Sequence, residues 1–255
     1  MRILSWDVGI KNLAYCLIDI TDTIQIIDWG IINLLEAVRN QKMVDCTKIY
    51  NASTSEMFGN SIDEDGFQRE TTPLIPVSPY GCSKVFGYNI ARNYRNSYGM
   101  YISNGILFNH ESPRRGSNFV TNKVAKTAVE IKLGMRDKLA LGNLNATRDW
   151  GHAKDYVEAM WMILQLDQPD DFVCATGISH SVQDLVEFVF NKLDLDWKEH
   201  ITVDEKYLRP EELEDLKGDS SKLREVTGWE LNYTFEEMMN EMVDYWLDYY
   251  DNKGR

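Results

Sequence analysis

A helix-length stretch between two short apolar stretches is the feature that most limits how this chain can fold. Residues 80–98 repeat apolar and aromatic side chains at helical spacing, and the pattern stops at Gly99. Short strands are expected before this helix, at 48–52, and after it, at 102–108. Because a strand, a helix and a second strand in succession favour parallel pairing, we expect an α/β fold built on a parallel sheet.

Further helices are expected along the rest of the chain. Apolar residues recur at helical spacing over the ranges 34–40 (the end of a helix), 121–134, 152–166, 181–193 and 234–251. The last range is amphipathic and rich in Met, Trp and Tyr, and we expect its apolar stripe to pack in a core.

The first 33 residues have a different pattern. Three stretches rich in apolar and β-branched residues, 2–7, 13–20 and 24–32, are separated by breaks short enough for hairpin turns. This pattern predicts a short antiparallel β-meander in front of the parallel sheet.

The charge of the chain argues against nucleic acid as a partner. The net charge is −13 over 255 residues, and a surface this acidic repels phosphate backbones. The clustered basic residues would suit one diphosphate, and they are Arg114, Arg115, Lys123 and Lys126.

Cysteine and histidine usage favours neither a disulfide framework nor a metal site. The four cysteines include no CxxC pair, and the four histidines have no metal-ligand spacing. No signal-peptide pattern and no run of about 18 apolar residues is present, so we expect a cytoplasmic protein with no membrane partner.

Tyr80 and Lys84 form the first candidate catalytic pair. Residues four apart share a face of a helix, so the phenol and the ammonium can meet. A phenol is a poor base at neutral pH, and a nearby ammonium stabilises its phenolate. Such a pair can take a proton from a sugar hydroxyl, although this spacing also arises by chance in a chain with 13 tyrosines.

Thr54 and Glu56 follow the predicted strand 48–52 and are two residues apart, so their side chains point the same way. A threonine hydroxyl can hydrogen-bond a developing oxyanion, and a glutamate can act as general acid or base in the removal of water. The alternative interpretation is a Ser/Thr-rich turn with a solvated glutamate.

Asn109, His110, Arg114 and Arg115 come at or just after the end of the strand 102–108. Open α/β sheets bind ligands at the carboxyl edge, where these side chains would supply amide, imidazole and guanidinium donors. Arginine suits bidentate recognition of phosphate. For any one of these residues the alternative is a solvated loop.

Longer strings of residues carry a family resemblance. They are YGMY at 98–101, NGILFNHESPRRG at 104–116, RDWGHAKDY at 148–156, YLRP at 207–210 and GDSSK at 218–222. In this order they resemble GDP-mannose 4,6-dehydratases, extended short-chain dehydrogenases/reductases of GDP-fucose biosynthesis, from about residue 34 onward. The resemblance implies a truncated Rossmann-type parallel sheet at 34–120 and a smaller α/β substrate domain at 121–255.

The resemblance also implies a reaction, the conversion of GDP-mannose to GDP-4-keto-6-deoxy-mannose with NADP as hydride carrier. Tyr80 would take the proton of the sugar 4-hydroxyl, while Lys84 would hold the cofactor ribose and lower the pKa of Tyr80. Glu56 would take the C5 proton as water leaves C6, and Thr54 would hydrogen-bond O4. Cofactor contacts are implied for His110 and Arg115, and GDP contacts for Asn109, Val120, Lys123, Arg148, Arg209 and Glu212.

The beginning of the chain departs from this family. The family opens with a Gly-x-x-Gly-x-x-Gly turn that receives the cofactor pyrophosphate, and this sequence contains no such string. Residues 3–19 instead resemble the opening strands of RNase H-like Holliday-junction resolvases, in which the first-strand aspartate, here Asp7, binds a catalytic metal. An aspartate beside a turn at Gly9 is the alternative. We therefore interpret the chain as a chimera whose first domain is 1–33.

Three functions follow as alternatives. The chain can be a dehydratase with a substituted N-terminus. It can be a binding or scaffold module that recognises a GDP-sugar without chemistry, as a homo-oligomer or paired with a full-length homologue. It can also be a metal-dependent junction nuclease led by Asp7, which the acidic charge and the lack of further matching carboxylates argue against.

Overall fold

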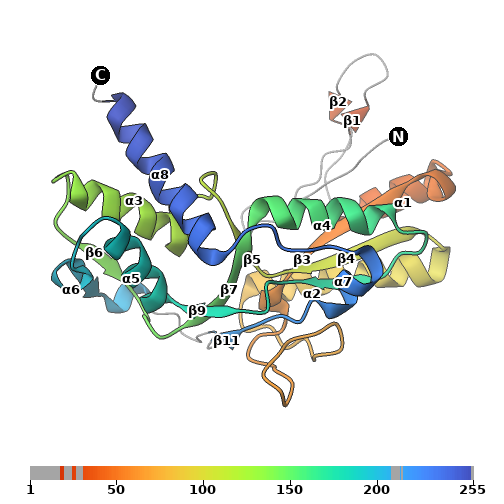
Figure 1. Cartoon of the computed structure of the whole chain (residues 1–255). Helices are drawn as coiled ribbons and strands as arrows, with labels where there is room; N and C mark the ends of the chain where they lie inside the picture. The colour runs from red at the N-terminus through yellow and green to blue at the C-terminus, as the bar shows by residue number, and fades with distance from the viewer. Residues whose placement is uncertain (1–17, 20–24, 27–30, 208–212, 214, 254–255) are drawn as a thin grey trace. The chain divides into compact units, whose positions relative to one another are not determined.

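The computed structural model describes residues 18–19, 25–26, 31–207, 213 and 215–253. Packing groups them into two compact units, each built from three stretches of chain (Figure 1). Unit 1 holds the described residues within Met1–Leu107, Glu158–Cys174 and Ser220–Trp229, and unit 2 holds those within Phe108–Val157, Ala175–Asp219 and Glu230–Arg255. The contiguous domains 1–33, 34–120 and 121–255 stay a prediction.

A parallel three-stranded sheet is the centre of unit 1. Its strands β3 (Lys48–Thr54), β4 (Tyr101–Leu107) and β8 (Asp171–Cys174) lie in that order. The helix α2 (Pro79–Tyr98) connects β3 to β4 and packs against both. The predicted strand–helix–strand unit and the parallel sheet are therefore confirmed. Between this sheet, α2 and α1 (Ile31–Asn40) lies a core of Leu35, Val38, Ile49, Ala91, Tyr94, Met100 and Ile102.

The ends of α2 follow from its sequence. Ser78 precedes the helix and its Oγ accepts a hydrogen bond from Gly81 N at 3.0 Å, while Pro79 occupies the first helical position, where no backbone N–H is needed. Gly99 ends the helix in the left-handed conformation, with φ of 64°. The smaller elements of unit 1 are η1 (Val44–Cys46), η2 (Ser55–Met57), α7 (Ser221–Thr227) and the second part of α4 (Ala153–Gln165).

The predicted β-meander lies mostly outside the described residues. Within them, β1 (Ile18–Asp19) pairs antiparallel with β2 (Gln25–Ile26), as expected for a hairpin. The strand expected over 24–32 is wrong at its end, because α1 already begins at Ile31. The buried Leu34, Leu35 and Val38 continue an apolar pattern at helical spacing, and this pattern extends the helix backward over two isoleucines that alone favour a strand.

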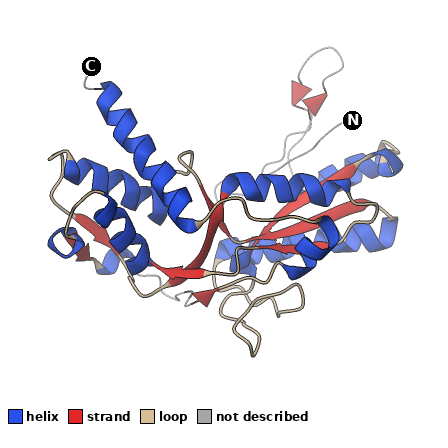
Figure 2. Ribbon diagram, viewed as in Figure 1, coloured by secondary structure: helices blue, strands red, loops and turns tan. Residues whose placement is uncertain are grey.

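Unit 2 combines short strands with a layer of helices (Figure 2). In its main sheet β7 (Thr147–His152) pairs parallel with β5 (Asn109–Glu111) and β11 (Asp215–Leu216), and antiparallel with β9 (Ser179–Ser181). A second pair joins β6 (Leu139–Leu141) to β10 (Ile201–Val203) in parallel. The helices are α3 (Val120–Lys132), α5 (Val182–Lys192), α6 (Trp197–His200) and α8 (Phe235–Lys253), with the first part of α4 and η3 (Glu205–Tyr207).

The core of unit 2 is formed by α3, α5 and α8, which pack on one another. Fully buried side chains such as Leu185, Phe190 and Met242 each contribute roughly 1.5–3 kcal/mol. The apolar stripe of the last helix is thus packing, as predicted. The helices α3, α4, α5 and α8 begin and end within two residues of the sequence predictions. Among the described helices, none is long and apolar enough to cross a membrane.

A buried carboxylate joins the sheet of unit 1 to α2. Asp171, at the start of β8, accepts two hydrogen bonds from the guanidinium of Arg95, at 2.9 and 3.1 Å, and one from Tyr88 Oη at 3.0 Å. Asn104 Nδ2 donates to the same carboxylate at 2.7 Å and links it to Asn51 on β3. Every strand of this sheet is therefore tied to one charge.

A second buried carboxylate organises unit 2. Asp149 on β7 is fully buried, and its oxygens accept hydrogen bonds from the backbone N–H groups of Thr176, Gly177 and Gly218 and from the Thr176 hydroxyl. Burial raises the pKa of Asp149 to about 6, although these hydrogen bonds act in the opposite direction.

Replacing Asp171 by Asn is expected to lower the free energy of unfolding of unit 1 by about 3 kcal/mol, because the guanidinium of the largely buried Arg95 would lose its counter-charge. The neighbouring Asp170→Asn is the matched control: its carboxylate is half-exposed and pairs with Lys222, so a loss of under ~1 kcal/mol is expected. Urea unfolding of both variants measures this, and equal losses would contradict the prediction.

Asp149 should make stability depend on pH. The folded protein keeps a proton on this group up to about pH 6, whereas an ordinary aspartate releases it near 3.8. The contribution of Asp149 to the free energy of unfolding therefore falls as pH rises from about 4 to 6, by roughly 3 kcal/mol at about 1.4 kcal/mol per pH unit. Urea unfolding across this range should show the free energy of unfolding of the wild type falling relative to that of Asp149→Asn as pH rises. A constant difference between the two proteins would refute the prediction.

Candidate active site

The four residues predicted to be catalytic lie at the carboxyl end of β3 and in the first turns of α2, all in unit 1. Thr54 is the last residue of β3 and Glu56 lies in η2 directly after it. Lys84 Nζ donates a hydrogen bond to the carbonyl of Ala52, at 2.9 Å, and lies 5.5 Å from the centre of the Tyr80 ring. The lysine thus joins the end of the strand to the tyrosine of the helix.

A second link holds Glu56 at the beginning of α2. Ser78 Oγ donates to Glu56 Oε2 at 3.0 Å and also accepts from Gly81 N. Gly81 permits this approach, because a Cβ there would lie 2.7 Å from the carbonyl oxygen of Glu56. Thr54 Oγ1 accepts a hydrogen bond from Glu56 N at 3.3 Å. Thr54, two residues before Glu56, therefore caps the start of η2.

The burial of Lys84 and the partial exposure of its neighbours determine what chemistry this group can perform. Only 5% of Lys84 is exposed, and a buried ammonium acts on nearby anionic groups with less screening than one in water. Tyr80 and Glu56 are partly exposed, so both can meet a ligand. A phenol beside an ammonium, with a carboxylate and a hydroxyl nearby, can move protons to and from a polar substrate.

Unit 2 holds the other predicted site residues that the structure describes. Asn109 and His110 lie on β5, and Arg148 lies on the neighbouring β7. His110 Nδ1 is 2.9 Å from the carbonyl oxygen of Phe108, and its ring stacks on Tyr156 with centres 4.9 Å apart. Arg148 donates to the carbonyl of Leu213 at 2.9 Å. These contacts fix the orientation of both side chains.

Arg115 is held by one acid and one aromatic ring. Its Nε lies 3.1 Å from Glu111 Oε2, and its guanidinium lies 3.6 Å from the centre of the Phe119 ring. Glu111 is buried, which raises its pKa, while the Arg115 charge and a hydrogen bond from Thr121 act to lower it.

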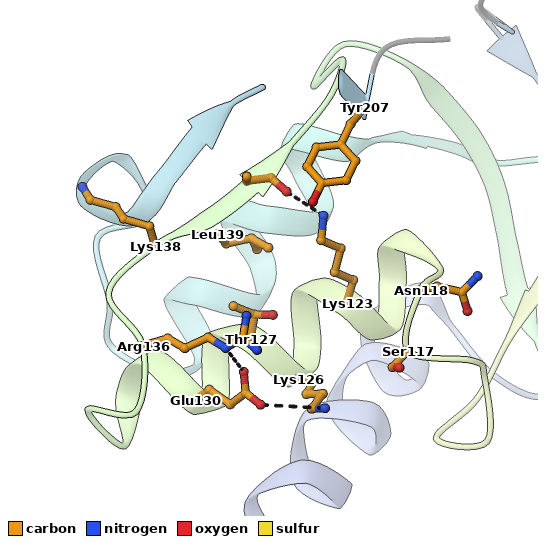
Figure 3. A pocket seen from close by; sticks show the side chains of 11 residues that line it. Ser117, Asn118, Lys123, Lys126, Thr127, Glu130, Arg136, Lys138, Leu139 and Tyr207 are labelled. Carbon is orange, nitrogen blue, oxygen red and sulfur yellow. Dashed lines mark hydrogen bonds and ion pairs between the residues drawn. The ribbon is translucent and has the colours of Figure 1, made fainter. Parts of the chain in front are cut away.

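A basic pocket of about 510 Å³ lies beside α3 in unit 2 (Figure 3). Such a volume is typical of small-molecule sites. Its lining includes four basic side chains and one acidic one: Lys123, Lys126, Arg136, Lys138 and Glu130. Glu130 pairs with Arg136 at 2.6 Å and with Lys126 at 3.8 Å. The pocket carries a positive charge excess in a strongly acidic chain, which favours an anionic ligand.

The pocket differs from the basic cluster expected from the sequence. Lys123 and Lys126 line it, whereas Arg115 is engaged by Glu111 and Phe119. Arg136 and Lys138 were not predicted, because neither belongs to a recognisable motif. The pairing of β6 with β10 orders the segment that follows them.

Several predicted residues stay untested by geometry. Val120 begins α3, one turn before Lys123. Arg209, Glu212 and Asp7 lie outside the described residues. Within the described part of the chain, no group of three His, Cys, Asp or Glu side chains is placed to hold a metal ion.

Comparison with known proteins places this arrangement in a family. The family model for GDP-mannose 4,6 dehydratase matches residues 18–242. GDP-mannose 4,6 dehydratase 1 of Arabidopsis thaliana is 48% identical over 224 residues, covering 87% of this chain and 61% of its own length. The Homo sapiens GDP-mannose 4,6 dehydratase is 46% identical over 231 residues, with 84% and 62% covered. The chain thus spans about three-fifths of these relatives.

Solved structures agree on the fold. A dTDP-glucose 4,6-dehydratase from Bacillus anthracis in complex with NAD superposes with a TM-score of 0.76 and 25% identity, covering 87% of this chain and 68% of that one. RMD from Pseudomonas aeruginosa complexed with NADPH gives 0.77 at 19% identity, with 86% and 72% covered, and supports the fold alone.

The family match begins inside the segment 1–33, so the resolvase resemblance of that segment gains no support from it. The matched region includes the end of β3, the start of α2, and the pocket beside α3. The chain belongs to the GDP-mannose 4,6-dehydratase family.

Proposed function

We propose that this chain converts GDP-mannose to GDP-4-keto-6-deoxy-mannose with loss of water. The observation that supports this most is the grouping of Thr54, Glu56, Tyr80 and Lys84 by two hydrogen bonds, from Lys84 to Ala52 and from Ser78 to Glu56. The family resemblance assigns these four residues to the same chemistry.

In this proposal each residue has one task. Tyr80 takes the proton of the sugar 4-hydroxyl, and the Lys84 ammonium stabilises the resulting phenolate. Thr54 donates a hydrogen bond to the sugar O4 as charge develops there. Glu56 takes the proton at C5 and gives it to the hydroxyl that leaves C6 as water. The proton held by Tyr80 returns to C5 when the hydride is added at C6, so protons and electrons balance.

The GDP part would bind to unit 2. The basic pocket supplies Lys123, and the proposal adds Val120 at the start of the same helix. Asn109 and Arg148, on neighbouring strands, offer an amide and a guanidinium. Arg209 and Glu212 complete the set on the basis of the family resemblance.

A bound nicotinamide cofactor, NADP in this proposal, would accept a hydride from the sugar C4 and return it at C6. The residues expected beside its ribose fit in chemistry: Lys84 is a buried ammonium whose partners include a carbonyl, and it lies over the phenol of Tyr80. His110 and Arg115 are the further contacts proposed. The glycine-rich turn that holds the pyrophosphate in this family is missing from the sequence, so the fit covers only part of the cofactor.

A binding module is the second candidate function: it would recognise a GDP-sugar without turnover, as a homo-oligomer or paired with a full-length homologue. The chain spans about three-fifths of its relatives, and its 255 residues include no glycine-rich turn of the family type. Both candidates share the GDP site and differ in chemistry. A cytoplasmic location fits either function and stays a prediction.

One activity assay distinguishes the two candidate functions. Purified chain incubated with GDP-mannose and NADP should give a 4-keto-6-deoxy hexose nucleotide, detected by NMR. Binding of GDP-mannose by calorimetry without product would support the binding module instead. If a folded chain neither binds nor converts GDP-mannose, the proposed function is wrong.

Tyr80→Phe should separate chemistry from binding. Loss of the phenol is expected to lower product formation by about 10²–10⁴-fold, because the proton acceptor is lost, while GDP affinity stays within about twofold. The matched control is Tyr98→Phe, an exposed tyrosine on the same helix, for which no change in rate is expected. Equal loss of rate and GDP affinity in Tyr80→Phe would indicate a structural role for this tyrosine.

A further inference from the structure

Tyr207 lines the basic pocket, and neither composition nor motif chemistry gives it a task. It is the last residue of η3 and is 45% exposed, so it is not a core residue. Figure 3 shows its ring at one end of the pocket, facing the end of the Lys123 side chain.

The backbone holds this ring in place. Asp204 N donates to the carbonyl of Leu141 at 2.9 Å, which fixes η3 to the end of β6, and Tyr207 N donates to the carbonyl of Asp204 at 3.0 Å. Gly142 follows β6, and a Cβ there would lie 2.7 Å from the carbonyl oxygen of Tyr207. The missing side chain at Gly142 therefore lets η3 approach the strand that lines the pocket.

Lys123 depends on two contacts at the pocket wall. Its Nζ donates to the carbonyl of Ala140 at 2.6 Å and lies 3.8 Å from the centre of the Tyr207 ring. A lysine ammonium lies at the end of a flexible four-carbon side chain, so each contact restricts the positions that the ammonium can take. Lys206 lies 4.9 Å from the same ring, but it is exposed and pairs with Asp204 at 2.6 Å.

The remaining basic groups of the pocket are held differently. Lys126 and Arg136 share Glu130, and Lys138 Nζ donates to the carbonyl of Glu199. Among the four basic side chains of this lining, Lys123 has the cation–π contact with a pocket residue, and it donates a hydrogen bond to the neutral carbonyl of Ala140. The pKa of the nearby Asp204 is lowered first by its hydrogen bond with Lys206, and the Lys123 charge also contributes to lowering it. Lys126 and Arg136 are instead paired with the Glu130 carboxylate inside the pocket, so Lys123 is the best placed of the three to bind a phosphate group.

We propose that Tyr207 is a positioning residue, whose ring face holds the Lys123 ammonium where it binds the diphosphate of the nucleotide. The proposal rests on the proposed function, because it takes a nucleoside diphosphate as the ligand of this pocket. It assigns the effect to the ring face and not to the hydroxyl. Contact of Tyr207 with the nucleotide base is the competing explanation.

The test compares Tyr207→Leu with Tyr207→Phe by calorimetry, using GDP and inorganic pyrophosphate as probes. Loss of the ring should weaken both probes about two- to fivefold, the range of a partly exposed cation–π contact, and Tyr207→Phe should bind like the wild type. In a Lys123→Met background, Tyr207→Leu should cause no further loss. The matched control is Tyr98→Leu, since Tyr98 is 44% exposed and lies under Arg39 at 4.3 Å, outside the pocket.

Three results would overturn the proposal. The first is unchanged affinity in Tyr207→Leu. The second is weaker GDP binding with unchanged pyrophosphate binding, which would assign the ring to the base. The third is a full effect of Tyr207→Leu without Lys123. If the wild type binds neither probe, the proposed function fails together with this inference, whereas the other results leave the proposed function intact.

Discussion

The hydrogen bond from the buried ammonium of Lys84 to the carbonyl of Ala52 is the contact on which the candidate active site depends. It crosses from α2 to β3 and fixes the helix against the end of the strand that carries Thr54. A buried ammonium is tolerated only where polar groups replace water, so this position demands a carbonyl on one side and an electron-rich group on the other. The ring of Tyr80 is that electron-rich group. The ammonium of Lys84 and the phenol of Tyr80 are also the two groups that the proposed proton transfer uses.

The parallel sheet makes this contact possible. A strand–helix–strand unit brings the carboxyl end of β3 and the amino end of α2 to the same edge. Asp171 then locks the three strands and the helix together through Arg95, Tyr88 and Asn104. A slip of β4 against β8 would separate Asn104 from Asp171 and leave a buried charge short of one hydrogen bond.

Local pattern was enough to predict most of this fold. The helix at 80–98 and its flanking strands have strong periodicity, and a cap residue, a proline and a glycine mark the ends of α2. The beginning of α1 was missed because Ile31 and Ile32 have β propensity on their own, and the buried Leu34, Leu35 and Val38 decide for a helix. The structural roles of Asp149, within the string 148–156, and of Asp171 were not predicted, since their partners are backbone and side-chain groups distant in sequence.

The candidate site was predictable to the extent that it consists of motifs. The spacing of Tyr80 and Lys84 and that of Thr54 and Glu56 predict the candidate catalytic group. The residues that link it, Ser78 and Gly81, are recognised only once the backbone is in place. The basic pocket was predictable only in Lys123 and Lys126. Arg136 and Lys138 belong to no motif, and Tyr207, although it begins the string YLRP, had no predicted place in the pocket; the arrangement of β6, β10 and η3 brings all three there.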